Sequence, residues 1–367
     1  MKKKQIAALF LTVVMLAGTA ACGKKEEAPA EAPAPAQTEA EDEGGESEAP
    51  AETPAAASDL EIGVNIQEFS NAYLTLMRNG MQASADGLGI KLDIVDGQSD
   101  STVISNNIDQ FLTKGYPVLA VNMMNTTDAP GILEKTDAEG VPVVFFNVEP
   151  EADVLAGSAT SYYVGAKAEA SGVMQGEAIA EYWNNNPDAD RNGDGTLQYV
   201  MIMGEPGHQD AIIRTESSVK AIEDAGIKVE ELACETANWA RAEGQDVMAS
   251  ILTAHDDIEA IICNNDEMAL GAIEALKAAG YLTDGGTFIP IVGVDATEEA
   301  QKAISEGTMY ASVFNDAAGQ ADAVVKLCQL IAGGETPTSE NLGYDLDGQY
   351  VWVPYIPVTA DNLDTIQ

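Results

Sequence analysis

The stretch PVLAVNMMNTTDAPGILEKTDAEGVPVVFFN, residues Pro117–Asn147, decides the fold class. Two short apolar runs flank a helical pattern near Ala129–Gly140, and the runs end on Asn122 and Asn147. Uniformly apolar runs of this length are typical of strands buried on both faces of a parallel sheet. The stretch therefore predicts a strand–helix–strand unit of an α/β fold.

The same kind of run recurs further along the chain, and it again ends on an amide or acid. AIICNN ends on Asn265, IVGVD on Asp295 and ASVFN on Asn315. In open α/β sheets, ligands bind outside the carboxyl ends of the strands. Because amide and acid side chains supply both donors and acceptors, this row of residues predicts a cleft for a small polyhydroxylated molecule.

Strand and helix patterns alternate through the whole body of the chain, in two similar sets. The first set begins with IGVNI at Ile62–Ile66, and the second begins after Tyr163 and includes LQYVMIM at Leu197–Met203. A helix near Asp316–Ala332 and a closing strand pair around Tyr350–Val358 remain after the second set. We therefore expect two doubly wound parallel-sheet lobes, with the chain returning to the first lobe and forming a hinge.

The expected division of the chain has four parts. They are an export signal at 1–22, a tether at 23–58, an N-terminal lobe at 59–149 and 317–351, and a C-terminal lobe at 150–316 and 352–367.

The N-terminal residues have the pattern of a bacterial lipoprotein signal. Basic Lys2–Lys4 precede the apolar run Ile6–Gly18, and TAAC ends on Cys22, the expected lipidation site. The alternative is an uncleaved anchor helix, but the run is shorter than the ~20 residues that a membrane span needs. Residues 23–58 are rich in Ala, Pro and Glu and contain too few large apolar residues to order themselves.

Composition excludes several classes of protein. The net charge of −42 argues against nucleic acid or anionic lipid as partners. Besides Cys22, the odd number of cysteines (Cys234, Cys263 and Cys328) and the absence of CxxC favour buried free thiols over a disulfide framework. No GxGxxG follows the first strand and no GK[ST] occurs after Met203, so nucleotide binding is not expected.

The segment DRNGDGTLQ, Asp190–Gln198, has the spacing of a calcium loop. Oxygen ligands would come from Asp190, Asn192, Asp194 and Gln198, with a backbone carbonyl from Thr196 and a sharp turn at Gly195. Met201 stands where an EF-hand needs a bidentate glutamate. The alternative is therefore a polar turn that holds no metal.

The segment HQDAIIR places His208, Asp210 and Arg214 at a predicted strand-to-helix junction. The Asp–Arg spacing fits a solvated helix pair of small energy. At the end of a strand, however, the same carboxylate and guanidinium could hold ligand hydroxyls. A His–Asp pair also suggests catalysis, but no Ser or Cys nucleophile stands in a recognisable motif. Binding is the favoured interpretation.

Two aromatic residues lie near the predicted carboxyl ends of strands. Tyr73 follows the first predicted strand, and Trp239 stands just before a predicted helix. Flat side chains cover the apolar faces of sugar rings at low entropic cost. Each residue could equally pack in the core, so the spacing alone leaves both roles open.

The chain from about Ile62 onward resembles the periplasmic glucose/galactose-binding proteins of sugar ABC importers. The resemblance is carried by VPVVFFNVEP, YYVGAKAEASGVMQGEAIA, GEPGHQDAIIRT, the loop at Asp190–Gln198, TANWA, NNDEMALGAIEALKA, GVDATEEA and VFNDAAGQA. It implies the type I periplasmic binding protein fold, with two lobes joined by three hinge crossings and the sugar enclosed between them.

The resemblance also implies roles for individual residues. Ring stacking falls to Tyr73 and Trp239, and hydroxyl binding to Asn122, His208, Asp210, Arg214, Asn265, Asp295 and Asn315. Glu259 would complete the structural calcium site. The segment FSNAY departs from the family, which usually has aspartate at Asn71 and phenylalanine at Tyr73. Since Asn71 could donate to the sugar 4-hydroxyl, the preferred epimer stays open.

We therefore expect an exported, lipid-anchored, monomeric binding protein on the outer face of the cytoplasmic membrane. It would capture D-galactose or D-glucose and deliver the sugar to an ABC permease. The alternatives are a chemotaxis or sensor receptor for the same sugar, a binding protein for another monosaccharide, and a sugar hydrolase using Asp210 and Asp295. The export signal and the absence of a helix-turn-helix exclude a DNA-binding repressor.

Overall fold

The computed structural model describes residues 59–283 and 285–366. Every described residue belongs to one compact unit of the chain, Pro54–Gln367. The predicted export signal, Cys22 and the tether therefore lie outside the described residues. Among the described residues, no helix combines the length and the apolar character that a membrane span requires.

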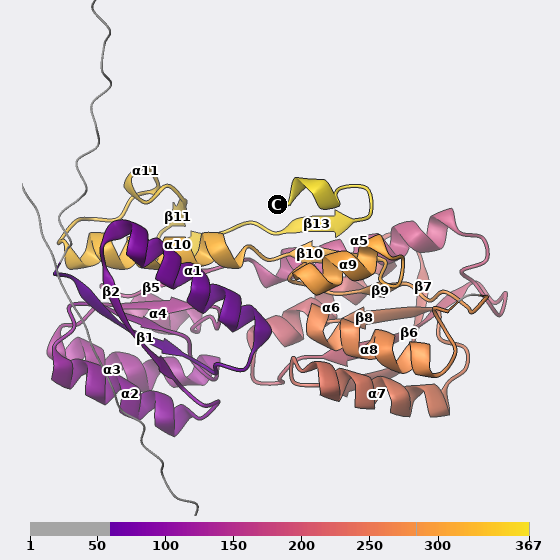
Figure 1. The fold of residues 1–367 in the computed structure, drawn as a ribbon, viewed down its shortest axis with the longest axis horizontal. Coiled ribbons are helices and arrows are strands. Elements are labelled where there is room, and N and C mark those ends of the chain that lie inside the picture. Colours follow the sequence, from indigo (N-terminus) through magenta and orange to yellow (C-terminus); the bar gives the residue numbers. More distant parts are fainter. Residues whose placement is uncertain (1–58, 284, 367) are drawn as a thin grey trace, which may run out of the picture. The chain divides into compact units, whose positions relative to one another are not determined.

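The first lobe, on the left of Figure 1, is built on one sheet. This sheet has seven strands in the order β11-β12-β5-β4-β3-β1-β2. The paired strands run parallel, except that β11 is antiparallel to β12. Its strands are β1 (Glu61–Ile66), β2 (Lys91–Asp96), β3 (Leu119–Val121), β4 (Val143–Phe146), β5 (Tyr162–Gly165), β11 (Asp345–Asp347) and β12 (Tyr350–Trp352). Helices α1 (Ala72–Leu88) and α10 (Ala317–Ala332) pack on one face, and α2 (Ser101–Lys114) and α3 (Ala129–Glu139) pack on the other.

The second lobe repeats this three-layer arrangement on a six-stranded sheet in the order β13-β10-β9-β8-β6-β7. Its strands are β6 (Thr196–Met203), β7 (Lys228–Thr236), β8 (Ala260–Cys263), β9 (Ile291–Val292), β10 (Ala311–Phe314) and the antiparallel β13 (Ile356–Thr359). Helices α5 (Ala168–Asn185) and α6 (Gln209–Asp224) cover one face. The other face is covered by α7 (Arg241–Ala254), α8 (Asp266–Ala278) and α9 (Glu298–Ser305). Short helical segments are η1 (Thr126–Asp128), α4 (Ala152–Gly157), α11 (Ser339–Leu342) and η2 (Leu363–Thr365).

Local sequence signals fix where the helices begin, and this matters for the site. The Asn71 side chain caps α1 by accepting a hydrogen bond from the Leu74 N–H, and Asn265 caps α8 through the Met268 N–H in the same way. His208 caps α6 through its ring nitrogen. The first turns of three helices therefore start at the carboxyl ends of their preceding strands, with polar side chains already turned toward that edge.

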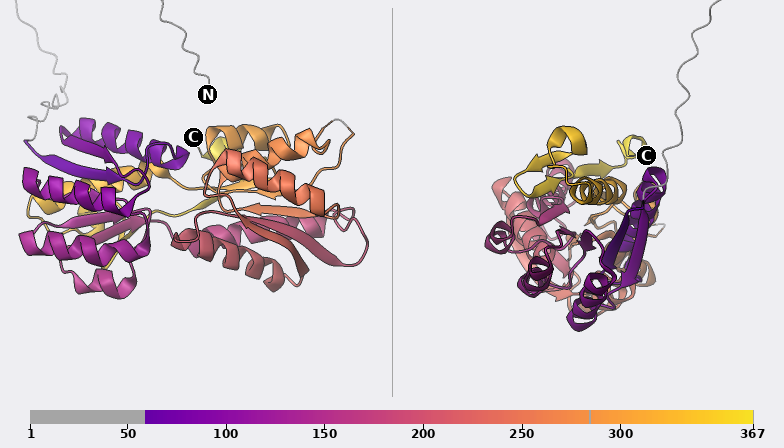
Figure 2. Two further views of the ribbon diagram at one scale, coloured as in Figure 1. Left: turned by 90° about the horizontal axis from the view of Figure 1, so that it is seen from below. Right: turned by 90° about the vertical axis from the view of Figure 1, so that its left-hand side faces the viewer.

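The chain passes between the lobes three times, at Ala166–Lys167, Asn315–Asp316 and Val353–Tyr355. Figure 2 shows the connecting segments running between the two lobes. The predicted fold of two parallel-sheet α/β lobes with a returning chain is confirmed.

One predicted boundary and one predicted strand pairing differ from the structure. The first crossing does not occur at residue 150, because β5 pairs with β4 and β12 in the first sheet and so carries residues 150–165 into the first lobe. The closing strands also do not pair with each other. β12 joins β5 in the first lobe, whereas β13 joins β10 in the second.

The three described cysteines are all free. Cys263 and Cys328 are buried, as predicted, but Cys234 is exposed. Cys234 lies in β7, which forms the edge of the second sheet and is therefore covered on fewer sides.

Candidate ligand-binding site

A cavity lies between the two lobes, where the carboxyl ends of their strands meet. Counting its open mouth and the adjoining solvent, it contains about 400 Å³ of space between protein atoms. It is lined by Gln67, Asn71, Tyr73, Leu74, Asn147, His208, Asp210, Arg214, Trp239, Asn265, Asp295 and Asn315. The structure thus brings together every residue predicted to bind the ligand except Asn122.

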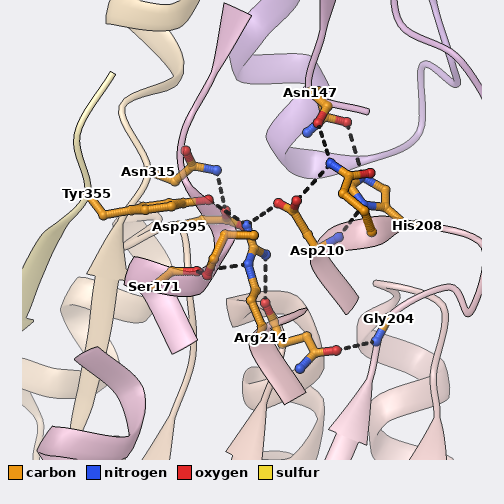
Figure 3. Close-up of polar contacts among 12 residues, drawn as sticks. Asn147, Ser171, Gly204, His208, Asp210, Arg214, Asp295, Asn315 and Tyr355 are labelled. Carbon is orange, nitrogen blue, oxygen red and sulfur yellow. Dashed lines mark hydrogen bonds and ion pairs between the residues drawn. The ribbon is translucent and has the colours of Figure 1, made fainter. Parts of the chain in front are cut away.

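Arg214 is the centre of the polar network in the cavity wall (Figure 3). Its guanidinium donates to the Asp210 carboxylate at 2.7 Å, the Tyr355 hydroxyl at 2.8 Å, the Asn264 carbonyl at 2.9 Å and the Ser171 hydroxyl at 3.1 Å. Side-chain exposure of the Arg214–Asp210 pair is only 5% and 8%. The alternative of a solvated surface pair is therefore wrong, and the fork geometry of arginine fixes the carboxylate at the cavity.

His208 faces the cavity as a neutral ring. Its Nδ1 accepts a hydrogen bond from the Asp210 N–H at 3.2 Å, which places the proton on Nε2. Burial lowers the pKa of His208. Nε2 lies 3.5 Å from the Asn147 Oδ1 in the opposite lobe. The residue therefore acts as a hydrogen-bond donor at the cavity, in agreement with the favoured interpretation of this segment as a binding site.

Two further contacts join the lobes around the cavity. The Gln67 amide donates to the Glu205 carboxylate at 3.2 Å, and the Gln209 amide donates to the Asn147 carbonyl at 3.2 Å. The lobes therefore touch at the rim of the cavity.

The four asparagine side chains in the wall each have their oxygen bonded to protein, which leaves N–H groups to face the cavity; Asn265 and Asn315 use part of this capacity on the Trp239 carbonyl and Asp295. The Asn71 oxygen accepts from the Leu74 N–H, that of Asn265 from the Met268 N–H, that of Asn147 from the Asn122 amide and that of Asn315 from the Gln320 amide. The carboxylates of Asp210 and Asp295 place charged acceptors in the same wall. A ligand hydroxyl, which accepts and donates at once, matches a wall divided in this way.

Asp295 is the second carboxylate, and it lies at the end of β9 beside the hinge. Burial raises its pKa, while Arg214 and a hydrogen bond from Asn315 act in the opposite direction. Its backbone has φ 113°, and two other lining residues, Asn147 and Trp239, each have φ 64°. Such left-handed backbone at non-glycine residues is costly and clusters at functional sites.

Asn122, a predicted ligand contact, does not line the cavity. The residue is fully buried, and its side-chain oxygen accepts from the Gln67 backbone N–H at 3.0 Å. Its amide donates to the Asn147 side chain at 3.2 Å. Asn122 therefore lies behind Gln67 and Asn147 and positions them, because the end of β3 is covered by its neighbours β1 and β4.

The two predicted aromatic residues enter the cavity from opposite lobes. Tyr73 is 7% exposed and belongs to the first turn of α1. Trp239 packs edge to face against His208, with ring centroids 5.2 Å apart. A Cβ on Gly204 would lie 2.2 Å from the Trp239 ring, so the indole rests directly on glycine backbone. The Trp239 indole ring is therefore held in a fixed orientation at the cavity.

Sequence reasoning missed several residues that shape the site. Gln67 and Leu74 line the cavity, and Asn147 does so as well although it was recognised only as a strand end. Ser171, Asn264 and Tyr355 hold Arg214 from outside the cavity. The two adjacent asparagines after β8 could have identified Asn264 as a residue of the site. No local sequence pattern identifies Ser171 or Tyr355.

The predicted calcium loop, Asp190–Gln198, lies at the start of β6, away from the cavity. Asp194 accepts from the Asn192 amide at 3.1 Å and the Gln198 amide at 3.0 Å, so these three side chains face one point. Glu259 is 2% exposed and accepts from the backbone N–H groups of Arg191 and Gln198. Among the described residues, no three His, Cys, Asp or Glu side chains come close enough to hold a metal. The oxygen-rich donor set nevertheless suits a hard cation.

Comparison with known proteins agrees with this geometry. The periplasmic binding protein domain family matches residues 62–336. The chain is 39% identical over 310 residues to the D-galactose/methyl-galactoside binding periplasmic protein MglB of Haemophilus influenzae, which covers 84% of this chain and 92% of that protein. It is 27% identical over 253 residues to the ribose import binding protein RbsB of Salmonella typhimurium, covering 69% of this chain and 78% of that protein.

A solved structure is similar as well. An ABC transporter solute binding protein from Bacillus halodurans C-125 with bound myo-inositol superposes with a TM-score of 0.71 at 30% identity, covering 84% of this chain and 98% of that chain. The predicted type I periplasmic binding protein fold is thereby confirmed. The chain belongs to the periplasmic binding protein family, whose members are extracytoplasmic solute-binding proteins and not enzymes.

Proposed function

We propose that the protein captures a hexose, D-galactose or D-glucose, between its two lobes and delivers it to an ABC permease. The observation that carries the proposal is the divided wall of the cavity, in which amide and guanidinium N–H groups surround two carboxylates. A sugar hydroxyl accepts from the first kind of group and donates to the second. The 39% identity to the galactose-binding relative supports a hexose as the ligand.

Enclosure between the lobes is what makes such a site selective. A buried donor or acceptor that finds no partner costs about 1–3 kcal/mol, so a sugar with one misplaced hydroxyl loses affinity. At Asn71, the amide oxygen caps α1 and only the N–H₂ is available. Asn71 would thus donate a hydrogen bond to a sugar hydroxyl. Both epimers, D-galactose and D-glucose, are therefore included in the test.

The test is calorimetric titration of the full chain with D-galactose, D-glucose, D-ribose and myo-inositol. We expect one of the two hexoses to bind at least about tenfold more tightly than ribose or inositol. Preferential binding of myo-inositol, the ligand of the similar Bacillus halodurans structure, would replace the hexose by a cyclic polyol. Absence of binding to all four would reject the proposal.

The cellular setting is part of the same proposal. A lipid on Cys22 and the tether at 23–58 would hold a monomeric binding protein on the outer face of the cytoplasmic membrane. The permease would then receive sugar from a locally concentrated donor. The alternative partner is a chemoreceptor, and pull-down with purified permease and sensor ectodomains separates the two.

We also propose that the loop Asp190–Gln198, together with Glu259, holds a structural calcium ion. Asp190, Asn192, Asp194 and Gln198 would supply side-chain oxygens, Thr196 a carbonyl, and Glu259 the carboxylate that Met201 cannot provide. The buried position of Glu259 against the loop backbone supports this assignment.

Calcium is expected to raise the melting temperature of chelator-treated protein by about 5 °C at saturating concentration, because it binds the folded state only. Glu259→Gln should remove most of this calcium-dependent shift. Asp188→Asn deletes an exposed acid just before the loop and should leave the shift intact. Equal shifts in wild type and Glu259→Gln would show that the calcium, if any, binds elsewhere.

A further inference from the structure

The Tyr73 hydroxyl is a buried polar atom without a protein partner. In the described part of the chain, three buried side-chain atoms lack one: the Tyr73 hydroxyl, Gln175 Oε1 and Gln209 Oε1. Of these three residues, only Tyr73 lines the cavity. Native proteins rarely leave such groups unpaired, and each exception points to a missing ligand or water. The ring of Tyr73 is held in the core of the first lobe, so the hydroxyl has a fixed position.

Tyr73 shares the cavity wall with Asp210, Arg214 and Asp295, which belong to the second lobe. Burial, followed by Asp295, raises the pKa of Tyr73, so the phenol keeps its proton and donates. Asp295 has one side-chain donor, the Asn315 amide at 3.3 Å, and makes no hydrogen bond to Tyr73 among the described residues. The cavity is therefore lined by an unpaired donor on Tyr73 and by an acceptor on Asp295.

A ligand hydroxyl in the cavity would suit both groups, since it can accept from the phenol and donate to the carboxylate. The sequence resemblance assigns Tyr73 only a stacking role, in which phenylalanine serves equally well. The structure adds a polar atom that phenylalanine lacks, at a place where it has no other function.

We propose that the Tyr73 hydroxyl donates a hydrogen bond to one ring hydroxyl of the bound sugar, which donates in turn to Asp295, so that this residue selects against ligands lacking that hydroxyl. The proposal rests on the proposed function and deepens it, because it assigns specificity to one atom of the cavity. It distinguishes this protein from relatives with phenylalanine at the position.

The test compares wild type and Tyr73→Phe by calorimetry with D-galactose, D-glucose and their 2-, 3-, 4- and 6-deoxy analogues. In wild type, one deoxy analogue should bind about tenfold more weakly than its parent because the phenol and Asp295 are left unpaired. In Tyr73→Phe, the affinity for the parent sugar should fall about tenfold. The difference in affinity between the parent sugar and that one analogue should shrink, while the differences for the other deoxy analogues should stay as in wild type.

Two controls separate binding from folding. Tyr199→Phe removes another buried tyrosine hydroxyl, which donates to Glu231 outside the cavity, and should leave all affinities unchanged. The ligand-free melting temperature of Tyr73→Phe should not fall, since the lost hydroxyl has no protein partner. Wild-type affinities in Tyr73→Phe for every sugar would overturn the inference and leave the proposed function standing. Failure of wild type to bind any of these sugars would instead reject the proposed function.

Discussion

Replacing Arg214 with alanine is expected to abolish measurable sugar binding and to lower the melting temperature of the ligand-free protein by roughly 10 °C. The guanidinium makes four hydrogen bonds inside the protein, and its removal leaves the buried Asp210 carboxylate without its cation. Breaking a buried pair in this way costs about 3–5 kcal/mol. Binding also loses the group that orients Asp210, so the affinity should fall by about 1000-fold or more.

Arg214→Lys separates charge from geometry. Lysine keeps the positive charge next to Asp210 but cannot reproduce the fork that also reaches Ser171 and the Asn264 carbonyl. Stability should therefore recover more than affinity does. The measurements are thermal melts and calorimetric titrations of both variants.

The matched control lies on the same helix. Lys220 and Asp224 form another i,i+4 ion pair on α6, but their side chains are 69% and 65% exposed. Lys220→Ala should change neither the melting temperature nor the affinity measurably, because exposed pairs contribute little. If Arg214→Ala behaved like Lys220→Ala, the central position of Arg214 in the site would be wrong.

Much of this architecture was predictable because local and global signals agree. Short apolar runs, capping residues such as Asn71 and Asn265, and the alternation of strand and helix all indicate the same α/β fold. The carboxyl ends of parallel strands necessarily meet at one edge, so polar residues found there were predicted to converge. Nine of the ten predicted binding residues line the cavity; the tenth, Asn122, does not.

Asn122 shows what strand-end position alone does not determine. Asn122 and Asn147 both follow apolar runs, yet one side chain is enclosed between neighbouring strands and the other reaches the cavity. The adjacent pair Asn264 and Asn265 divides in the same way, with Asn264 bonded to the Gly204 N–H and Asn265 lining the cavity. Which amide faces the ligand depends on the register of the strand within the sheet, and this is a tertiary property.

Long-range contacts explain the remaining differences. Tyr355 reaches Arg214 across 141 positions in the sequence, because the last hinge segment passes beside the second lobe. The first crossing was misplaced for a related reason. β5 is a four-residue strand whose membership of the first sheet is set by pairing with β4 and with the distant β12. No pattern within a short window carries that information.

Replacing Trp239 with alanine is expected to weaken every bound hexose by about 100-fold, with little change in their ranking. Trp239 lines the cavity with apolar surface that would contact the face of each sugar ring in the same way, whereas the ranking would depend on polar lining residues such as Asn71 and Asp295. Trp239→Phe should recover part of the affinity because a smaller aromatic ring remains. Calorimetric titration with D-galactose and D-glucose measures both effects.

The main alternative explanation is that loss of the indole disturbs its neighbours. Trp239 packs on Gly204 and against the His208 ring, so the alanine variant could shift these residues as well. Gly204→Ala tests this directly, because its Cβ would push the indole from its place while keeping the residue. If both Trp239→Ala and Gly204→Ala lower the affinity for all hexoses equally, and both melt close to the wild-type temperature, the indole ring in its native position is required for binding. Unchanged titrations in Trp239→Ala would mean that Trp239 is only packing, and that the affinity comes from the hydrogen-bonding groups alone.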